Sequence, residues 1–97
     1  MKVSFLAPAL DEFLSGIRYY NNQRSGLGEE FQLAVDEALQ VVMQFPFGIA
    51  PEADRPHLRI KPVRRFPYGV VYEVLKDEIV VHAVMHLHRR PGYWHDR

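Results

Sequence analysis

The chain has 97 residues, no cysteine, and equal numbers of acidic and basic side chains. A sequence of this length makes one domain, so we expect residues 1–97 to fold as a single unit. The lack of cysteine excludes disulfides, thiolate zinc sites and cysteine nucleophiles. No apolar run approaches the roughly 20 residues that span a bilayer, and no apolar leader follows Met1, so we expect a cytosolic protein.

The charges are unevenly distributed along the chain. Residues 1–54 carry three cations and eight anions, a net charge of −5, whereas residues 55–97 carry nine cations and four anions, a net charge of +5. Such a division can mark a surface for an anionic partner. It can equally reflect acids near the start of helices and cations on the wet face of strands, and the sequence leaves both interpretations open.

The first half of the chain predicts one strand and two helices. Lys2–Phe5 alternates polar and apolar residues, which is typical of a short strand. Pro8 stands where a first helical turn would begin, and this helix should run to about Arg24. A glycine-containing break follows, and a second amphipathic helix begins at Glu29. The apolar faces predicted to be buried comprise Leu10, Phe13, Leu14, Ile17 and Tyr20 in the first helix and Leu27, Phe31, Val35, Ala38, Leu39, Val42 and Phe45 in the second.

The second half predicts a loop and three strands. Three prolines fall in the aperiodic stretch Pro46–Pro56, which indicates a surface loop. Leu58–Val63 alternates apolar and cationic residues and predicts a strand that ends near Pro62. Tyr68–Leu75 and Glu78–Leu87 are rich in β-branched residues and predict an antiparallel hairpin. The order β-α-α-β-β-β predicts an α+β fold, in which an N-terminal helical hairpin packs on one face of a small twisted antiparallel sheet.

Alternation along the strands sorts their side chains between the two faces of the sheet. We expect the helices to face the more apolar set of the last strand, which is Ile79, Val81, Ala83, Met85 and Leu87. The opposite face should be open to solvent and should gather charged and imidazole groups. These predicted open-face residues are Arg59, Lys61, Glu73, His82, His86 and His88, with Arg64, Arg65, Arg89 and Arg90 at the edges.

The predicted open face is compatible with three uses. RNA cleavage needs a base, an acid and cations that stabilise the phosphorane. Glu73 or His86 could supply the base, and the cations would be Arg59, Lys61 and Arg65. A metal site is the second use, although only His86 and His88 lie close enough on one strand to share an ion. The third use is a solvated face that binds a protein partner without chemistry. The sequence predicts no cofactor.

Aromatic residues have structural roles in this interpretation. Trp94 stands near the end of the sequence, and we predict that its large apolar ring pins this segment to the domain. The residues expected in the core or at its rim, rather than as stacking platforms for bases, are Tyr19, Tyr20, Phe66, Tyr72 and Tyr93.

Four stretches occur in an order typical of a known family. They are Tyr19-Tyr20, Gly26-Leu27-Gly28-Glu29-Glu30-Phe31, Arg65-Phe66-Pro67-Tyr68 and His86-Leu87-His88-Arg89-Arg90-Pro91-Gly92-Tyr93-Trp94. Together with the order β-α-α-β-β-β, they resemble the ParE/RelE superfamily, the toxin halves of bacterial type II toxin–antitoxin operons. The resemblance covers almost the whole chain and is closer to the ParE-like branch, often labelled plasmid-stabilisation proteins.

The resemblance implies a partner and a growth-inhibiting activity. The partner would be a small antitoxin whose segment wraps over the toxin, neutralises it and forms a hetero-oligomer with it. ParE-type members poison DNA gyrase, whereas RelE-type members cut messenger RNA in the ribosome. We expect the gyrase-binding activity, because a net charge of zero does not favour an RNA-lined target.

Two alternatives accompany that expectation. In a RelE-like endoribonuclease, the residues at places comparable to the family's catalytic groups would be Arg59, Lys61, Arg65, His86, Arg89 and Tyr93. In a member that has lost toxicity, only the pairing with the antitoxin would remain. In every case, we expect the antitoxin to contact apolar surface near the helix pair and the sheet edge, by strand addition or as a helix in a groove.

Overall fold

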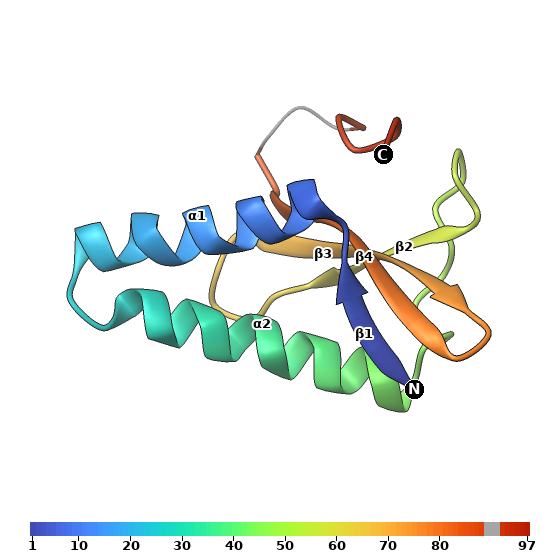
Figure 1. The fold of residues 1–97 in the computed structure, drawn as a ribbon, viewed down its shortest axis with the longest axis horizontal. Helices are drawn as coiled ribbons and strands as arrows, with labels where there is room; N and C mark the ends of the chain where they lie inside the picture. Colours follow the sequence, from blue (N-terminus) through green and yellow to red (C-terminus); the bar gives the residue numbers. More distant parts are fainter. Residues whose placement is uncertain (89–91) are drawn as a thin grey trace.

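The computed structural model describes residues 1–88 and 92–97 of the chain. Figure 1 shows two helices side by side as an antiparallel pair, with the strands gathered next to them. None of the described helices is long and apolar enough to cross a membrane. The elements are β1 (Lys2–Phe5), α1 (Ala7–Gln23), α2 (Leu27–Gln44), β2 (Leu58–Pro62), β3 (Tyr68–Leu75) and β4 (Glu78–His86).

The four strands form one sheet in the order β1-β4-β3-β2. The pairs β2–β3 and β3–β4 are antiparallel, and the helices pack on one face, so the predicted α+β fold is confirmed. The pairing of β1 with β4 is parallel, where an antiparallel sheet was expected throughout. A short turn forces β3 and β4 to run in opposite directions, whereas the long connection from β1 through both helices permits either direction.

The two helices approach closely at the turn that joins them. Gly26 has a φ angle of 87°, a left-handed conformation that glycine adopts without steric cost. A Cβ atom on Gly28 would clash with the carbonyl oxygen of Ile17 and with the side chain of Asn21. Because glycine leaves that space free, the N–H of Gly28 donates a 2.8 Å hydrogen bond to Oδ1 of Asn21 and satisfies one of the free donors at the start of α2.

Aromatic rings fill the space between the helices and the sheet. Phe31 is completely buried, and its ring centroid lies 4.8 Å from Tyr68, 5.2 Å from Tyr20 and 5.3 Å from Phe66. Tilted and edge-on contacts at such distances are the favoured geometry for aromatic pairs. The core on the helix side is therefore organised around one phenylalanine of α2.

The buried side of α1 differs from the prediction. Leu10 and Leu14, expected in the core, are 43% and 42% exposed. The buried residues of this helix are Ala9, Phe13 and Gly16. Gly16 lies where α1 approaches α2 closely, because a Cβ at this position would clash with the ring of Phe31.

His82 forms a β-bulge in β4. Val71 lies opposite Ala83 and Tyr72 lies opposite Val81, so one residue of β4 has no counterpart on β3. An extra residue shifts the alternation by one, and the side chains beyond it face away from the side that unbroken alternation predicts.

The bulge corrects the predicted faces of β4. Ile79 and Val81 precede it and pack on the helix side, as predicted. Val84 follows it and also packs with the helices, although the sequence placed it on the open face. The residues wrongly predicted to face the helices are Ala83, Met85 and Leu87.

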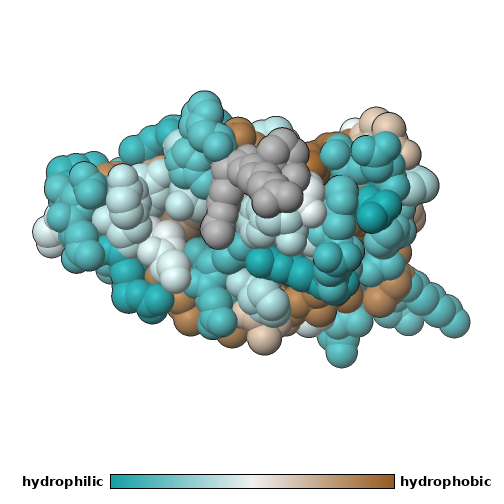
Figure 2. Space-filling view, turned by 90° about the horizontal axis from the view of Figure 1, so that it is seen from above, coloured by the Kyte–Doolittle hydropathy of each residue, from teal (hydrophilic) through white to brown (hydrophobic). Residues whose placement is uncertain are grey.

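A C-terminal clasp, Gly92–Arg97, covers the outer face of the sheet, which is the face opposite the helices. Trp94 is only 5% exposed, and this confirms the prediction that its ring pins the segment down. Its partners in the outer core are Leu58, Val71, Ala83 and Met85. The sheet therefore has apolar cover on both faces, and in the view of Figure 2 the surface is mainly hydrophilic.

The clasp is fastened by an ion pair. Arg97 donates to both carboxylate oxygens of Glu12 in α1, at 2.8 and 3.1 Å, and to the carbonyl oxygen of His82 at 3.0 Å. Glu12 also accepts a 3.1 Å hydrogen bond from the N–H of Val84. The hydrogen bond to Glu12 raises the pKa of Arg97 despite its partial burial. Glu12 and Arg97 therefore form hydrogen bonds with the backbone edge of β4 in the part of the strand that β1 does not pair with.

Candidate functional site

The predicted open face is not assembled as expected. Arg59 lies opposite Tyr72 and Lys61 lies opposite Val70, and directly opposed residues share a face. Arg59 and Lys61 therefore project on the helix side. The sequence suggested otherwise because alternation alone does not show which face of β2 is covered. In the structure, the clasp covers the apolar residues Leu58 and Ile60 on the outer face.

The imidazole groups are divided between the two faces. His82 is on the outer face, where its Nε2 lies 3.0 Å from Oε1 of Glu73. His86 lies opposite Tyr68 on the helix side, and its ring centroid is 5.2 Å from that of Tyr68. The ring of the exposed His88 is 5.2 Å from that of His86. No group of three His, Asp or Glu side chains able to hold a metal ion occurs within residues 1–88 and 92–97.

Arg59 is engaged in holding the loop between α2 and β2. Its guanidinium donates to the carbonyl oxygen of Ile49 and lies 5.1 Å from the centre of the Phe47 ring. The hydroxyl of Tyr72 donates a 3.1 Å hydrogen bond to the carbonyl oxygen of Pro46 in the same loop. Burial raises the pKa of Tyr72, so this hydroxyl remains a donor. Both side chains therefore serve to position the loop.

The other nuclease candidates lie apart from one another. Arg65, in the β2–β3 turn, has a φ angle of 72° and pairs with Glu30 at 2.9 Å. The hydroxyl oxygen of Tyr93 is buried on the outer side, and the guanidinium of Arg97 lies 5.1 Å from the centre of the Tyr93 ring. Arg89 and Arg90 fall outside the described residues. Arg59, Lys61 and His86 thus project on the helix side and Arg65 contacts α2, whereas Tyr93 lies on the outer side of the sheet.

A groove runs along α2, where this helix faces β2 and the β2–β3 turn. Three adjoining hollows of about 270, 100 and 270 Å³ make it up. The first two share Ala34, Glu37 and Arg64, and the last two share Val41 and Lys61. We call it the α2–β2 groove.

One stripe of α2 forms the first wall of the α2–β2 groove. Its residues recur every three or four positions, which places them on one side of the helix. They are Glu30, Leu33, Ala34, Glu37, Ala38, Val41, Val42 and Phe45. The opposite wall comprises Lys61, Pro62, Arg64 and Arg65, with Gly48 and Ile49 at one end.

Large apolar side chains stand exposed along this groove. Leu33 is 62% exposed, and Phe45, which the sequence placed on the buried face of α2, is 65% exposed. Val41 lies between them and is also exposed. The apolar surface of α2 is thus wider than the sheet can cover, and the excess lines the groove. Sequence periodicity could have indicated this, because Leu33 falls beside the stripe assigned to the core.

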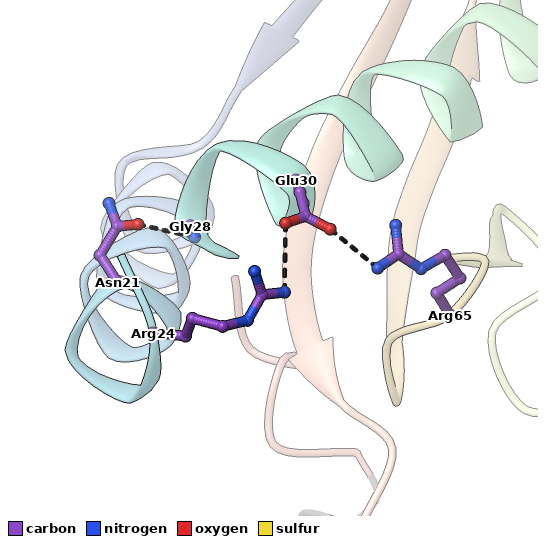
Figure 3. A network of polar contacts seen from close by, with 5 residues as sticks. All are labelled: Asn21, Arg24, Gly28, Glu30 and Arg65. Carbon is purple, nitrogen blue, oxygen red and sulfur yellow. Dashed lines mark hydrogen bonds and ion pairs between the residues drawn. The ribbon is translucent and has the colours of Figure 1, made fainter. Parts of the chain in front are cut away.

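Charges at one end of the groove are already paired. Glu30 accepts hydrogen bonds from Arg65 at 2.9 Å and from Arg24 at 3.2 Å, so one carboxylate joins the α1–α2 turn to the β2–β3 turn (Figure 3). The bond from Arg65, together with Arg24, lowers the pKa of Glu30. Within the described residues, neither Lys61 nor Arg64 has such a carboxylate partner. The middle of the groove therefore carries two cations that form no ion pair with a described carboxylate, and Glu37 lines the same hollow.

Comparison with known proteins gives a likeness of fold. No family model and no curated protein matches this sequence. Among solved structures, a chain of the chromosomal ParDE TA system from P. aeruginosa is similar, with a TM-score of 0.65 and 16% sequence identity. The match covers 90% of this chain and 96% of that chain. This likeness shows the fold that the resemblance to the ParE/RelE superfamily implied.

Proposed function

We propose that this chain is the toxin of a type II toxin–antitoxin module, and that a cognate antitoxin holds it inactive by occupying the α2–β2 groove. The observation that carries the proposal is this open, apolar groove on a fold similar to that of a chain from a ParDE TA system. An exposed apolar surface that continues over several turns of a helix is typical of a protein-binding site. The groove also lies between the helix pair and the β2 edge of the sheet, where contact with the antitoxin was expected.

We further propose that the toxin acts by binding its target, with DNA gyrase as the target. Two observations support binding over RNA cleavage. Transesterification needs a base, an acid and cations around a single phosphate. Arg59, Lys61 and His86 share the helix side, but Tyr93 and the other candidate base, Glu73, lie on the outer side. Arg59 and Arg65 are moreover engaged with groups of the protein itself.

Expression of the chain without its partner tests both proposals. We expect growth arrest, with DNA damage and intact messenger RNA in the arrested cells. The variants Arg65→Ala and His86→Ala should arrest growth as strongly as the unchanged chain, provided that western blots show equal amounts of protein. Cleaved messages, together with loss of arrest in these two variants, would establish the nuclease instead. Normal growth at full expression would leave only the pairing function.

The partner is tested with the product of the neighbouring reading frame, which in toxin–antitoxin operons encodes the antitoxin. Co-expression should restore growth, and the two proteins should co-purify. Hydrogen exchange of the complex should show new protection in α2 and β2, because these elements form the groove walls. Unchanged exchange in both elements of a complex that does form would place the antitoxin elsewhere.

A further inference from the structure

We propose that the α2–β2 groove takes an amphipathic α-helix whose carboxylates pair with Lys61 and Arg64, rather than an added β-strand. This inference rests on the proposed function, because it specifies the chemistry of the antitoxin segment that occupies the groove. It concerns three separate properties of the occupant, which are its secondary structure, its length and the positions of its charges.

The exposed edge of β2 is poorly suited to strand addition. Leu58 already donates its N–H to the carbonyl oxygen of Arg55 and accepts from the N–H of Glu52, at 2.8 and 2.9 Å. In an antiparallel pair, backbone groups point alternately toward the partner strand and away from it, so Ile60 and Pro62 also face outward. Proline has no N–H to donate. Within the described residues, the N–H of Ile60 is then the one remaining donor of β2 on this edge, whereas strand addition needs a row of donors.

The dimensions of the groove fit a helix. Its α2 wall extends from Glu30 to Phe45, and at 1.5 Å per residue such a stripe is about 22 Å long. A partner helix of about 15 residues would have the same length and would bring three or four of its own apolar side chains to the groove. The exposed Leu33 and Phe45 lie near the two ends of this stripe, so a partner helix of this length could contact both.

The charges define one flank of the partner helix. Lys61 and Arg64 line the sheet side of the middle hollow, and within the described residues neither forms an ion pair with a carboxylate. Glu37 lies on the α2 side of the same hollow. Acidic residues of the partner should therefore face β2, and its basic residues should face α2. Such an arrangement fixes how the partner helix is rotated about its axis, because the reverse rotation would oppose like charges.

The test uses two synthetic helical peptides of about 16 residues with the same leucine stripe. In the first, glutamates flank the stripe on one side and lysines on the other; in the second, all flanking residues are lysines. We expect the first peptide to bind at least tenfold more tightly at low salt, because two charge-assisted contacts of modest strength amount to about one order of magnitude. Amide chemical shifts of residues in α2 and β2 should move on binding, and the preference should weaken as salt is added.

Matched variants assign that preference to the groove. Lys61→Glu with Arg64→Glu should abolish or reverse it, and Lys61→Gln with Arg64→Gln should abolish it with less risk to folding. Lys76→Glu makes the same kind of charge change at the exposed β3–β4 turn, and it should leave the preference intact. Circular dichroism confirms that each variant is folded before it is titrated.

The inference is overturned if both peptides bind equally, if neither binds, or if the shifted amides lie outside α2 and β2. The same variants, co-expressed with the neighbouring gene product, separate this result from the proposed function. Full neutralisation of Lys61→Glu/Arg64→Glu by that product would overturn the charge assignment while leaving the toxin–antitoxin function standing. An absence of growth arrest in the unchanged chain would count against toxicity, and the peptide preference would still report on the groove.

Discussion

The outer face of the sheet and the α2–β2 groove are both apolar surfaces, but the chain covers only the first. On the outer face, the clasp lays Trp94 over the sheet and fastens it with the ion pair between Arg97 and Glu12. In the groove, Leu33 and Phe45 remain more than half exposed. Exposed apolar side chains that continue along a helix are typical of a protein-binding site, and this contrast is why we propose the groove, and not the outer face, for the antitoxin.

The difference also concerns charge. The ion pair of the clasp is largely withdrawn from solvent, since the side chains of Arg97 and Glu12 are 18% and 14% exposed. At the groove, Arg65 pairs with Glu30 in open solvent, and Lys61 and Arg64 have no described carboxylate partner. We therefore expect substitutions in the clasp to affect folding, and substitutions in the groove to affect binding.

The largest effect should come from the ring that closes the outer face. Trp94→Ala should lower the free energy of unfolding by about 3 kcal/mol, at the low end for a buried tryptophan because the clasp can detach and regain conformational entropy. Leu33→Ala in the groove should change it by no more than about 0.5 kcal/mol. Urea unfolding followed by circular dichroism measures both. Similar losses in the two variants would remove the distinction between a closed and an open surface.

A smaller loss is expected when the fastening ion pair is broken. Arg97→Ala leaves the carboxylate of Glu12 partly buried and bonded mainly to the N–H of Val84, so we expect a loss of about 1–2 kcal/mol. Adding Glu12→Gln to Arg97→Ala should cost little more, because the two residues act on each other. A double-mutant cycle measures this coupling, and strictly additive losses would show that the clasp is held by its tryptophan alone.

The smallest effect should be a change with pH at the exposed end of the groove. Because its pKa is lowered in the folded protein, ionised Glu30 favours folding above its ordinary pKa of 4.5, and this contribution is lost as the pH falls below that value. Glu30→Gln should therefore be slightly less stable than the unchanged chain at pH 7 and equally stable near pH 2. Urea midpoints at both pH values test this. A constant difference between the two proteins would mean that Arg24 and Arg65 do not stabilise the carboxylate.

The sequence predicted the elements well because their signals are local. Lys2–Phe5 and Tyr68–Leu75 were predicted with the bounds observed, and both helices were predicted to within a few residues. Strand alternation is visible over a few residues and helical periodicity over a few turns. Both patterns therefore predict an element without knowledge of the rest of the fold.

The candidate site was predicted less well because it depends on contacts between distant segments. The open face was assigned by assuming that only one side of the sheet is covered. The bulge at His82 in β4 has no local signature in the sequence, and the sequence of β2 does not show that Trp94 covers its outer face. The groove depends on how α2 packs beside β2 and the β2–β3 turn, which is a contact between segments far apart in the sequence. The expectation of a partner near the helix pair stays a prediction, and the groove gives it a definite place.

The bulge also means that β4 contains a spare residue. If His82 were deleted, Val81 would be followed by Ala83, and every other side chain of the strand would keep the face that it now occupies. What the spare residue supplies is a carbonyl turned out toward Arg97 and an imidazole beside Glu73. The length of this strand can therefore vary at one position without exchanging the residues of the two cores.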